Sequence, residues 1–261
     1  MSHEAQNKAK GYEYVFADVV LLLYASLVYF SCFAGPIYLL WSFRSAPLYI
    51  LLLLTIIGMV TAPMTFICIL GLTRVLLVNN LPTGRLSMRD PKGLGWIFAI
   101  RVMVFYIGSP LRPIINDHMI FRYLFYRGMG AKLYPDTLLA SGVLLTDPWA
   151  ISIGRHTLVG HEACISGHHI QDQELFLGRV EVGDDVVIGA RSFIWPDVKI
   201  GNGAKIAAYS VVARGTVIPP GEVWGGIPAR KLSVASEAQT SFEQTLSGLP
   251  HAEPSLRGRF P

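Results

Sequence analysis

The stretch that decides the fold is Val180–Leu232, VEVGDDVVIGARSFIWPDVKIGNGAKIAAYSVVARGTVIPPGEVWGGIPARKL. Within it an aliphatic residue recurs at every sixth position from Val182 to Ile218, and glycine directly follows several of these residues. A period of six fits neither the 3.6-residue turn of an α-helix nor the alternation of an ordinary strand. It is typical of a parallel β-helix, in which each hexad forms one flat side and three sides close a triangular coil.

The same period extends toward the N-terminus, with two interruptions. The first is a two-residue slip before Ile153, and the second is the break between Ile165 and Val182, which contains SGHHIQDQELFLGRVE. We expect the second segment to leave the coil as a loop, and loops on a rigid scaffold are where function concentrates. The residues predicted to point inward are Leu133, Leu139, Leu145, Ile153, Val159, Ile165, Val182, Ile188, Ile194, Ile200, Ile206, Val212 and Ile218.

The composition divides the chain into two chemically different halves. Of the 261 residues, 52% are hydrophobic and only 15% are charged, which is low for a soluble domain. Residues 1–130 carry 11 Lys and Arg against 5 Asp and Glu, whereas residues 131–261 carry 11 against 13. The basic excess forms no clustered run, so nucleic-acid binding is not expected. The three cysteines, an odd number without short spacing, exclude a disulfide framework and a CxxC zinc site.

Two long uncharged segments predict membrane-spanning helices. Val19–Phe43 has 25 residues without a charge and Ser45–Thr73 has 29, and each exceeds the roughly 20 residues that cross a bilayer core. Lysines precede the first segment and several basic residues follow the second, while only Arg44 lies between them. By the positive-inside rule both ends of this hairpin lie in the cytoplasm, and so does everything that follows. The polar N-terminus predicts no cleavable signal peptide.

Residues 94–127 are apolar but interleave aromatic residues with arginines. This pattern favours helices that lie in the headgroup layer and form an interfacial platform. The competing interpretation is a third short span, because Leu94–Gly108 is apolar except for Arg101. Fifteen residues are few for crossing a bilayer.

The closing repeats resemble those of the hexapeptide-repeat acyltransferases. Gly226-Ile227-Pro228-Ala229 matches their GxPA ending, and Ala207–Val212 matches the segment before it. Thr146–Gly154, Gly167-His168 and the run from Leu175 to Val180 resemble a narrower branch. That branch includes sugar O-acetyltransferases and the membrane-embedded carboxy-terminal module of ε-poly-lysine-type peptide synthetases. The resemblance implies a left-handed β-helix that works as a homotrimer and takes acyl groups from coenzyme A or an acyl carrier protein.

The interruption after Ile165 carries the candidate catalytic residues His168, His169 and Asp172. Acyl transfer to a hydroxyl or amine needs a base for the proton of the acceptor, and an imidazole suits that role near neutral pH. The resemblance implies one such histidine in a cleft between subunits. Gly-His followed by an acid four residues later favours His168 oriented by Asp172, whereas a one-residue slip would select His169. Two surface histidines without a role are the remaining alternative.

His156, His161 and His168 suggest a rival, a zinc site between subunits like that of γ-class carbonic anhydrases. The spacing does not reproduce that family's ligands, since Ser166 follows His161 by five residues, so no metal is expected. For the donor, the resemblance implies backbone contacts at Ala190 and Ala208. It also implies phosphate contacts at Arg214, Arg230 and Lys231, for which a solvated terminal edge is the alternative.

Taken together, the sequence predicts an α-helical transmembrane hairpin with interfacial helices, followed by an all-β left-handed parallel β-helix. The expected parts are residues 1–84 (hairpin), 85–131 (interfacial helices), 132–231 (β-helix) and 232–261 (C-terminal tail). The predicted activity is acyl transfer, acetyl in the first instance, from a coenzyme A thioester or acyl carrier to a lipid-linked, sugar or other amphiphilic acceptor. The predicted location is a bacterial-type inner membrane with the coil in the cytoplasm and lipid as a partner. The alternatives are a non-catalytic trimeric membrane scaffold and amide-forming ligation from a carrier-bound aminoacyl donor.

Overall fold

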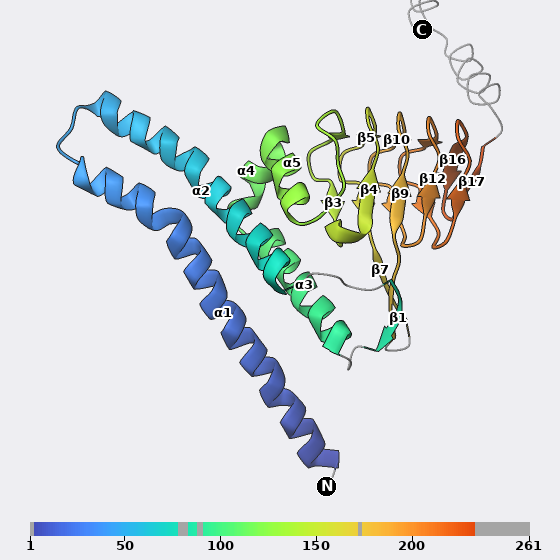
Figure 1. Cartoon of the computed structure of the whole chain (residues 1–261), viewed down its shortest axis with the longest axis horizontal. Helices are drawn as coiled ribbons and strands as arrows, with labels where there is room; N and C mark the ends of the chain where they lie inside the picture. The colour runs from blue at the N-terminus through green and yellow to red at the C-terminus, as the bar shows by residue number, and fades with distance from the viewer. Residues whose placement is uncertain (1–2, 78–82, 88–90, 172–173, 233–261) are drawn as a thin grey trace, which may run out of the picture.

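The computed structural model describes residues 3–77, 83–87, 91–171 and 174–232. Helices α1 (His3–Ser42) and α2 (Leu48–Leu77) run antiparallel as a hairpin, and a parallel-stranded coil stands to one side of it (Figure 1). The predicted order of two long apolar helices followed by a coil of parallel strands is thereby confirmed. The predicted tail lies outside the described residues apart from Leu232.

Both long helices have the length and composition to cross a membrane. Asp18–Ser42 has 25 residues with a mean hydropathy of 1.9, and Leu48–Leu76 has 29 with a mean hydropathy of 2.3. Only 11% and 22% of their most apolar windows are buried inside the protein. Most of their leucine, isoleucine and aromatic side chains therefore face outward, unlike those of a helix in a soluble core.

Helix α3 (Pro91–Ile107) packs alongside the hairpin. The Phe105 ring lies 5.2 Å from the Tyr29 ring and 5.6 Å from the Phe66 ring, measured between centroids. An ion pair of 3.4 Å joins Arg101 to Asp18 of α1. The chain then turns through α4 (Arg112–Asp117) into α5 (Met119–Gly128), which packs on α2 and leads into the coil.

Three sheets of mainly parallel strands form the sides of the coil. Their strands are short because each side holds only one hexad, and every predicted inward residue is 6% exposed or less. The first sheet contains β2 (Leu138–Leu139), β5 (Leu158–Val159), β10 (Val187–Ile188), β13 (Lys205–Ile206), β16 (Val223–Gly226) and β17 (Ala229–Lys231). The second contains β3 (Leu144–Leu145), β6 (Cys164–Ile165), β11 (Phe193–Ile194) and β14 (Val211–Val212). The third contains β4 (Ile151–Ile153), β9 (Val180–Val182), β12 (Lys199–Ile200) and β15 (Val217–Ile218).

The glycines that follow the inward residues are required where successive coils touch. A Cβ on Gly160 would lie 2.6 Å from the backbone nitrogen of Ala190, and one on Gly189 would lie 2.6 Å from the Cα of Ala208. Contacts this short with backbone atoms cannot be relieved by turning a side chain. Glycine at these positions therefore allows the close stacking of the coils.

Both interruptions of the period produce structure outside the regular coil. The two-residue slip becomes the 3-10 turn η1 (Pro148–Ala150), and the longer break becomes a hairpin of β7 (His168–Gln171) and β8 (Glu174–Leu177). Figure 1 shows this hairpin projecting below the coil.

A third strand, β1 (Gly84–Ser87), pairs antiparallel with β8. The sequence predicts interfacial helices over residues 85–131, but residues 85–87 belong to this strand instead. The edge of the hairpin offers unpaired backbone groups that β1 satisfies. Leu86 also packs with the buried Leu175 and Leu177. The segment after α2 is thus tied to the coil.

Candidate active site

The two interruptions meet because the strands before them are neighbours. β3 pairs with β6 in parallel, with Leu145 opposite Ile165. The residues that follow each strand therefore leave the coil at the same corner, one coil apart. Asp147 comes two residues after Leu145, and His168 comes three residues after Ile165. The slip and the loop together build one site.

At this corner the His168 imidazole pairs with the Asp147 carboxylate. Nδ1 of His168 lies 2.6 Å from Oδ2 of Asp147. The aspartate side chain is fully buried, whereas the histidine side chain is 22% exposed. A carboxylate at Nδ1 orients the ring and favours the tautomer with its proton on Nδ1, which leaves Nε2 able to accept a proton. Within the described part of the chain, Nε2 makes no hydrogen bond.

Further hydrogen bonds stabilise the buried carboxylate. Its Oδ2 also accepts from the Thr146 hydroxyl at 2.8 Å and from the Gly167 backbone N–H at 3.1 Å. Its Oδ1 accepts from the indole Nε1–H of Trp96 at 2.9 Å. A buried negative charge is tolerated when it is hydrogen-bonded in this way. The arrangement holds the Asp147 carboxyl group in place behind His168.

The surroundings of the pair are apolar on one side. The Trp96 and His168 rings meet edge to face with centroids 5.0 Å apart. Burial raises the pKa of the Cys164 thiol to about 11, and the negative charge of Asp147 adds to the rise. Cys164 is therefore a neutral packing group at this corner and not a nucleophile.

His169 lies on the opposite face of β7, because successive residues of a strand alternate in direction. Its ring contacts Trp195 at 5.0 Å and lines a cavity of about 180 Å³. The other residues that line this cavity are Arg85, Gln171, Glu174, Phe176 and Arg214. Hence the two adjacent histidines have different surroundings, and only His168 contacts a carboxylate among the described residues.

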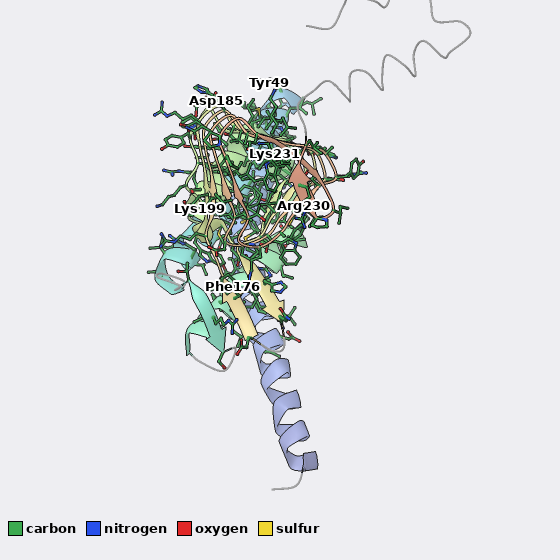
Figure 2. The ribbon with its side chains drawn as sticks, turned by 90° about the vertical axis from the view of Figure 1, so that its right-hand side faces the viewer. Tyr49, Phe176, Asp185, Lys199, Arg230 and Lys231 are labelled. Carbon is green, nitrogen blue, oxygen red and sulfur yellow. The ribbon has the colours of Figure 1, made fainter. Side chains whose placement is uncertain are left out.

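The predicted donor residues lie at three separate places. Ala190 and Ala208 occupy the same corner of neighbouring coils, and the Tyr209 N–H donates to the Ala190 carbonyl at 2.9 Å. The Arg214 guanidinium stacks over the Phe176 ring at 4.3 Å, beside the cavity of His169. Figure 2 shows Phe176 on the projecting hairpin and Arg230 and Lys231 on the closing strands of the coil.

Lys231 is held by an ion pair on the closing strands. Its Nζ lies 2.5 Å from Oε1 of Glu222, and the Trp224 indole N–H donates to the other carboxylate oxygen at 2.8 Å. These two donors lower the pKa of Glu222 below its usual value. Arg230 is free of such a carboxylate pairing in the described structure and donates only to the Ala229 carbonyl.

The three histidines of the rival zinc hypothesis have separate partners. His156 lies 3.3 Å from Asp136 and 3.5 Å from Asp185, while His161 lies 3.4 Å from Glu162. Over the described ranges, no three His, Cys, Asp or Glu side chains are grouped so that they could hold a metal ion. The structure does not bring His156, His161 and His168 together.

Sequence reasoning missed Asp147 and Trp96. Asp172, proposed to orient His168, lies outside the described residues. The two-residue slip after Leu145 was a usable signal for Asp147, because an acid at a break in a regular coil is displaced from the repeating sheet. Nothing local in the sequence marks Trp96, which is 51 residues from Asp147.

Residues 179–214 match the family described as bacterial transferase hexapeptide (six repeats). The regular repeats of this coil are therefore similar to the hexapeptide repeats of that family. The match covers the regular repeats that follow the hairpin, where the period of six is uninterrupted.

Three known proteins are similar to parts of this chain. YvoF of Bacillus subtilis (strain 168), described as a candidate acetyltransferase, is 36% identical over 98 residues, which cover 38% of this chain and 56% of YvoF. The delta-poly-L-ornithine synthetase of Acinetobacter baumannii is 24% identical over 162 residues, 62% of this chain and 12% of that protein. A solved hexapeptide-repeat acetyltransferase of Vibrio cholerae has 23% identity and a TM-score of 0.43, over 57% of this chain and 94% of that one. The chain thus spans about half of YvoF and a small part of the synthetase.

Proposed function

We propose that this protein is a membrane-anchored acyltransferase. In this proposal it moves an acyl group, acetyl in the first instance, from coenzyme A or an acyl carrier protein to a hydroxyl or amine. The observation that carries the proposal is the pairing of His168 with the buried Asp147 at the one corner where both repeat interruptions meet. The match of residues 179–214 to the hexapeptide-repeat model and the likeness to YvoF support acyl transfer as the reaction class.

The site can perform this reaction by general base catalysis. Nε2 of His168 takes the proton from the acceptor hydroxyl or amine while that group attacks the thioester carbonyl carbon. Asp147 stabilises the imidazolium that forms and keeps the ring in place. When the tetrahedral intermediate collapses, the carbon–sulfur bond breaks and the same Nε2 returns the proton to the departing sulfur. The products are the acylated acceptor and a free thiol.

For the donor we retain the residues proposed from the resemblance. Ala190 and Ala208 present backbone groups along one corner of the coil, where a pantetheine arm could lie in an extended form. Arg214 is well placed to contact an anionic group, because it borders the cavity beside His169 together with Arg85. Arg230 and Lys231 are proposed phosphate contacts at the far end of the coil. The coil is proposed to be left-handed and to trimerise, with the site in a cleft between subunits.

Membrane anchoring rests on the two outward-facing apolar helices. Their length, hydropathy and low burial fit lipid as the surrounding medium. Together with the basic flanks, they support a hairpin with both ends at the cytoplasmic face of an inner membrane. In that arrangement an amphiphilic acceptor reaches the site from the bilayer while the donor arrives from the cytosol. Carbonate washing of membranes tests this point, because an integral protein stays in the pellet and a peripheral one is released.

A second candidate is ligation of a carrier-bound aminoacyl group to an amine. The match to the polyornithine synthetase favours this candidate. The matched segment has 162 residues, more than the predicted coil of residues 132–231, so the likeness extends beyond the coil. The site chemistry would be the same, since an amine also loses a proton to a base as it attacks a thioester. The two candidates differ in the donor.

Thermal unfolding of the detergent-purified protein tests the proposed function. Acetyl-CoA, longer acyl-CoAs, aminoacylated carrier protein and zinc are added separately. A ligand that binds only the native state stabilises it by about 2.7 kcal/mol at 100 times its Kd. We expect stabilisation by a thioester, and the preferred thioester separates the two candidates. Stabilisation by zinc alone, or by none of these, would contradict acyl transfer and favour a metal site or a trimeric scaffold respectively.

A further inference from the structure

The helical half of the molecule reaches directly into the candidate site. Trp96 lies in the second turn of α3, the helix that packs along α1 and α2, and is only 4% exposed. Its indole contacts two components of the site. Nε1–H donates to Asp147, and the ring edge meets the His168 ring. Through this indole, α3 contacts both members of the Asp147–His168 pair.

The indole also packs in a small apolar cluster. The buried Trp96, Leu175 and Leu177 form its centre, with Trp149 and Leu86 packed against it. Packing alone would need only the ring. A buried indole N–H, however, requires an acceptor, and here the acceptor is the Asp147 oxygen that has no other donor among the described residues. The Trp96 indole is thus oriented so that its N–H donates to Asp147 and not to a backbone carbonyl.

The hydrogen bond fixes how the carboxylate can turn. Oδ2 accepts from His168, Thr146 and Gly167, which lie in the coil or at the base of the hairpin that projects from it. Oδ1 accepts from Trp96, the only donor to it in the described residues. Without this fourth bond the carboxylate could rotate about its Cβ–Cγ bond, and the angle at which it meets Nδ1 would vary. Charge-assisted hydrogen bonds of this kind impose geometry as well as stability.

We propose that Trp96 is a positioning residue that holds the Asp147–His168 pair from the helical half of the molecule. The inference rests on the proposed function of that pair. α3 is itself held against α1 by the Arg101–Asp18 ion pair and against both long helices through Phe105. The site geometry therefore depends on how the apolar helices pack, and the reaction is set up in full only when the helical half is assembled.

The test uses the full chain in lipid nanodiscs, with acetyl-CoA as donor and octyl glucoside as a probe acceptor. Trp96→Phe removes the N–H and keeps an aromatic ring. Trp149→Phe is the matched control, because Trp149 packs in the same cluster and makes no hydrogen bond within the described residues. Release of free coenzyme A gives kcat and KM. A misplacement of about 1 Å in a catalytic group can cost about 10²-fold in rate.

We expect Trp96→Phe to lower kcat by about 10-fold or more with KM for acetyl-CoA within about twofold of the wild type. Trp149→Phe should leave both constants within about twofold. A second readout needs no turnover, namely the NMR signal of the His168 Nδ1–H proton in protein labelled with ¹⁵N-histidine. That signal should move in Trp96→Phe and stay in place in Trp149→Phe. If Trp96→Phe does not fold, benzothienylalanine at position 96 keeps the bicyclic shape and lacks the N–H.

His168→Ala separates failure of this inference from failure of the proposed function. If His168→Ala keeps full turnover, the proposed function fails, whatever Trp96 does. If His168→Ala loses turnover while Trp96→Phe matches Trp149→Phe in kcat and in the His168 signal, only the positioning role is overturned.

Discussion

Among single residues, the proposed mechanism depends most on Asp147. Its side chain is fully buried and its partners are His168, Thr146, Gly167 and Trp96. Asp147→Asn keeps the shape but removes the negative charge that stabilises a protonated His168. An amide nitrogen facing Nδ1 also favours the wrong tautomer. We expect kcat to fall by roughly 10²–10⁴-fold, the range for losing general base catalysis, with acetyl-CoA and octyl glucoside as probes.

The control for Asp147→Asn is Asp136→Asn, which changes an aspartate of the coil that pairs with His156 instead. It should retain most of the turnover. Equal activity in the two variants would show that the carboxylate at His168 has no special role.

A second prediction at this scale concerns Cys164. Burial, and to a smaller extent the charge of Asp147, raises the pKa of the Cys164 thiol to about 11. Little of it is therefore ionised at pH 8. Alkylation by iodoacetamide in the native protein should be on the order of 100-fold slower than in the unfolded chain, and mass spectrometry of the Cys164 peptide measures it. The rate should rise as pH approaches 11. Equal native and unfolded rates at pH 8 would mean that this corner is open to solvent.

At the scale of the element, the projecting hairpin is held by the same cluster that contains Trp96. Leu175 is completely buried there, whereas Ile170, on the neighbouring strand, is 47% exposed. Leu175→Ala leaves a cavity and should lower the free energy of unfolding by about 2–5 kcal/mol, while Ile170→Ala should change it by less than about 1 kcal/mol. The melting temperatures of the two variants in detergent make the comparison. Similar shifts would indicate that the hairpin does not dock on α3.

The closing hairpin of β16 and β17 supplies a pH-dependent element. Hydrogen bonds from Lys231 and Trp224 lower the pKa of Glu222, so the charged carboxylate favours the closed hairpin. This contribution is complete above the usual glutamate value of 4.5 and is lost as pH falls through the lower value of the folded state. We expect the Leu232 amide, bonded to the Val223 carbonyl, to lose protection from hydrogen exchange below about pH 4.5, after correction for intrinsic exchange.

Glu222→Gln should abolish this pH step, because glutamine does not titrate. Glu181→Gln, which changes a glutamate paired with Lys199 on another side of the coil, should leave the step intact. A step that persists in Glu222→Gln would assign the pH dependence to another group.

At the scale of the whole molecule, the regular and irregular parts differ in how far the sequence predicts them. The coil repeats a local rule, since each hexad needs only one inward aliphatic residue, and so Val182, Ile188 and their equivalents predict it. The site arises where that rule is interrupted. His168 could be found in the longer break, but Asp147 became its partner only because β3 and β6 stack one coil apart.

The contacts between the helical half and the coil half are even harder to predict from the sequence. β1 pairs with β8 across 87 to 93 positions of sequence, and Trp96 bonds to Asp147 across 51. Neither contact leaves a periodic trace, because each is made once and depends on how α3 packs against the coil. Long-range contacts of this kind connect the apolar helices to the chemistry, and they become visible only in the folded structure.

His168 is the proposed general base of acyl transfer, and its neighbour His169 provides the control. His168→Ala and His169→Ala remove adjacent imidazoles from opposite faces of β7, and the melting temperature of each variant checks that it has folded. The measurement is the rate of coenzyme A release from acetyl-CoA by each full-length variant in nanodiscs with octyl glucoside. We predict a loss of about 10²–10⁴-fold for His168→Ala and less than about 10-fold for His169→Ala. Full turnover by His168→Ala would show that His168 is not the general base.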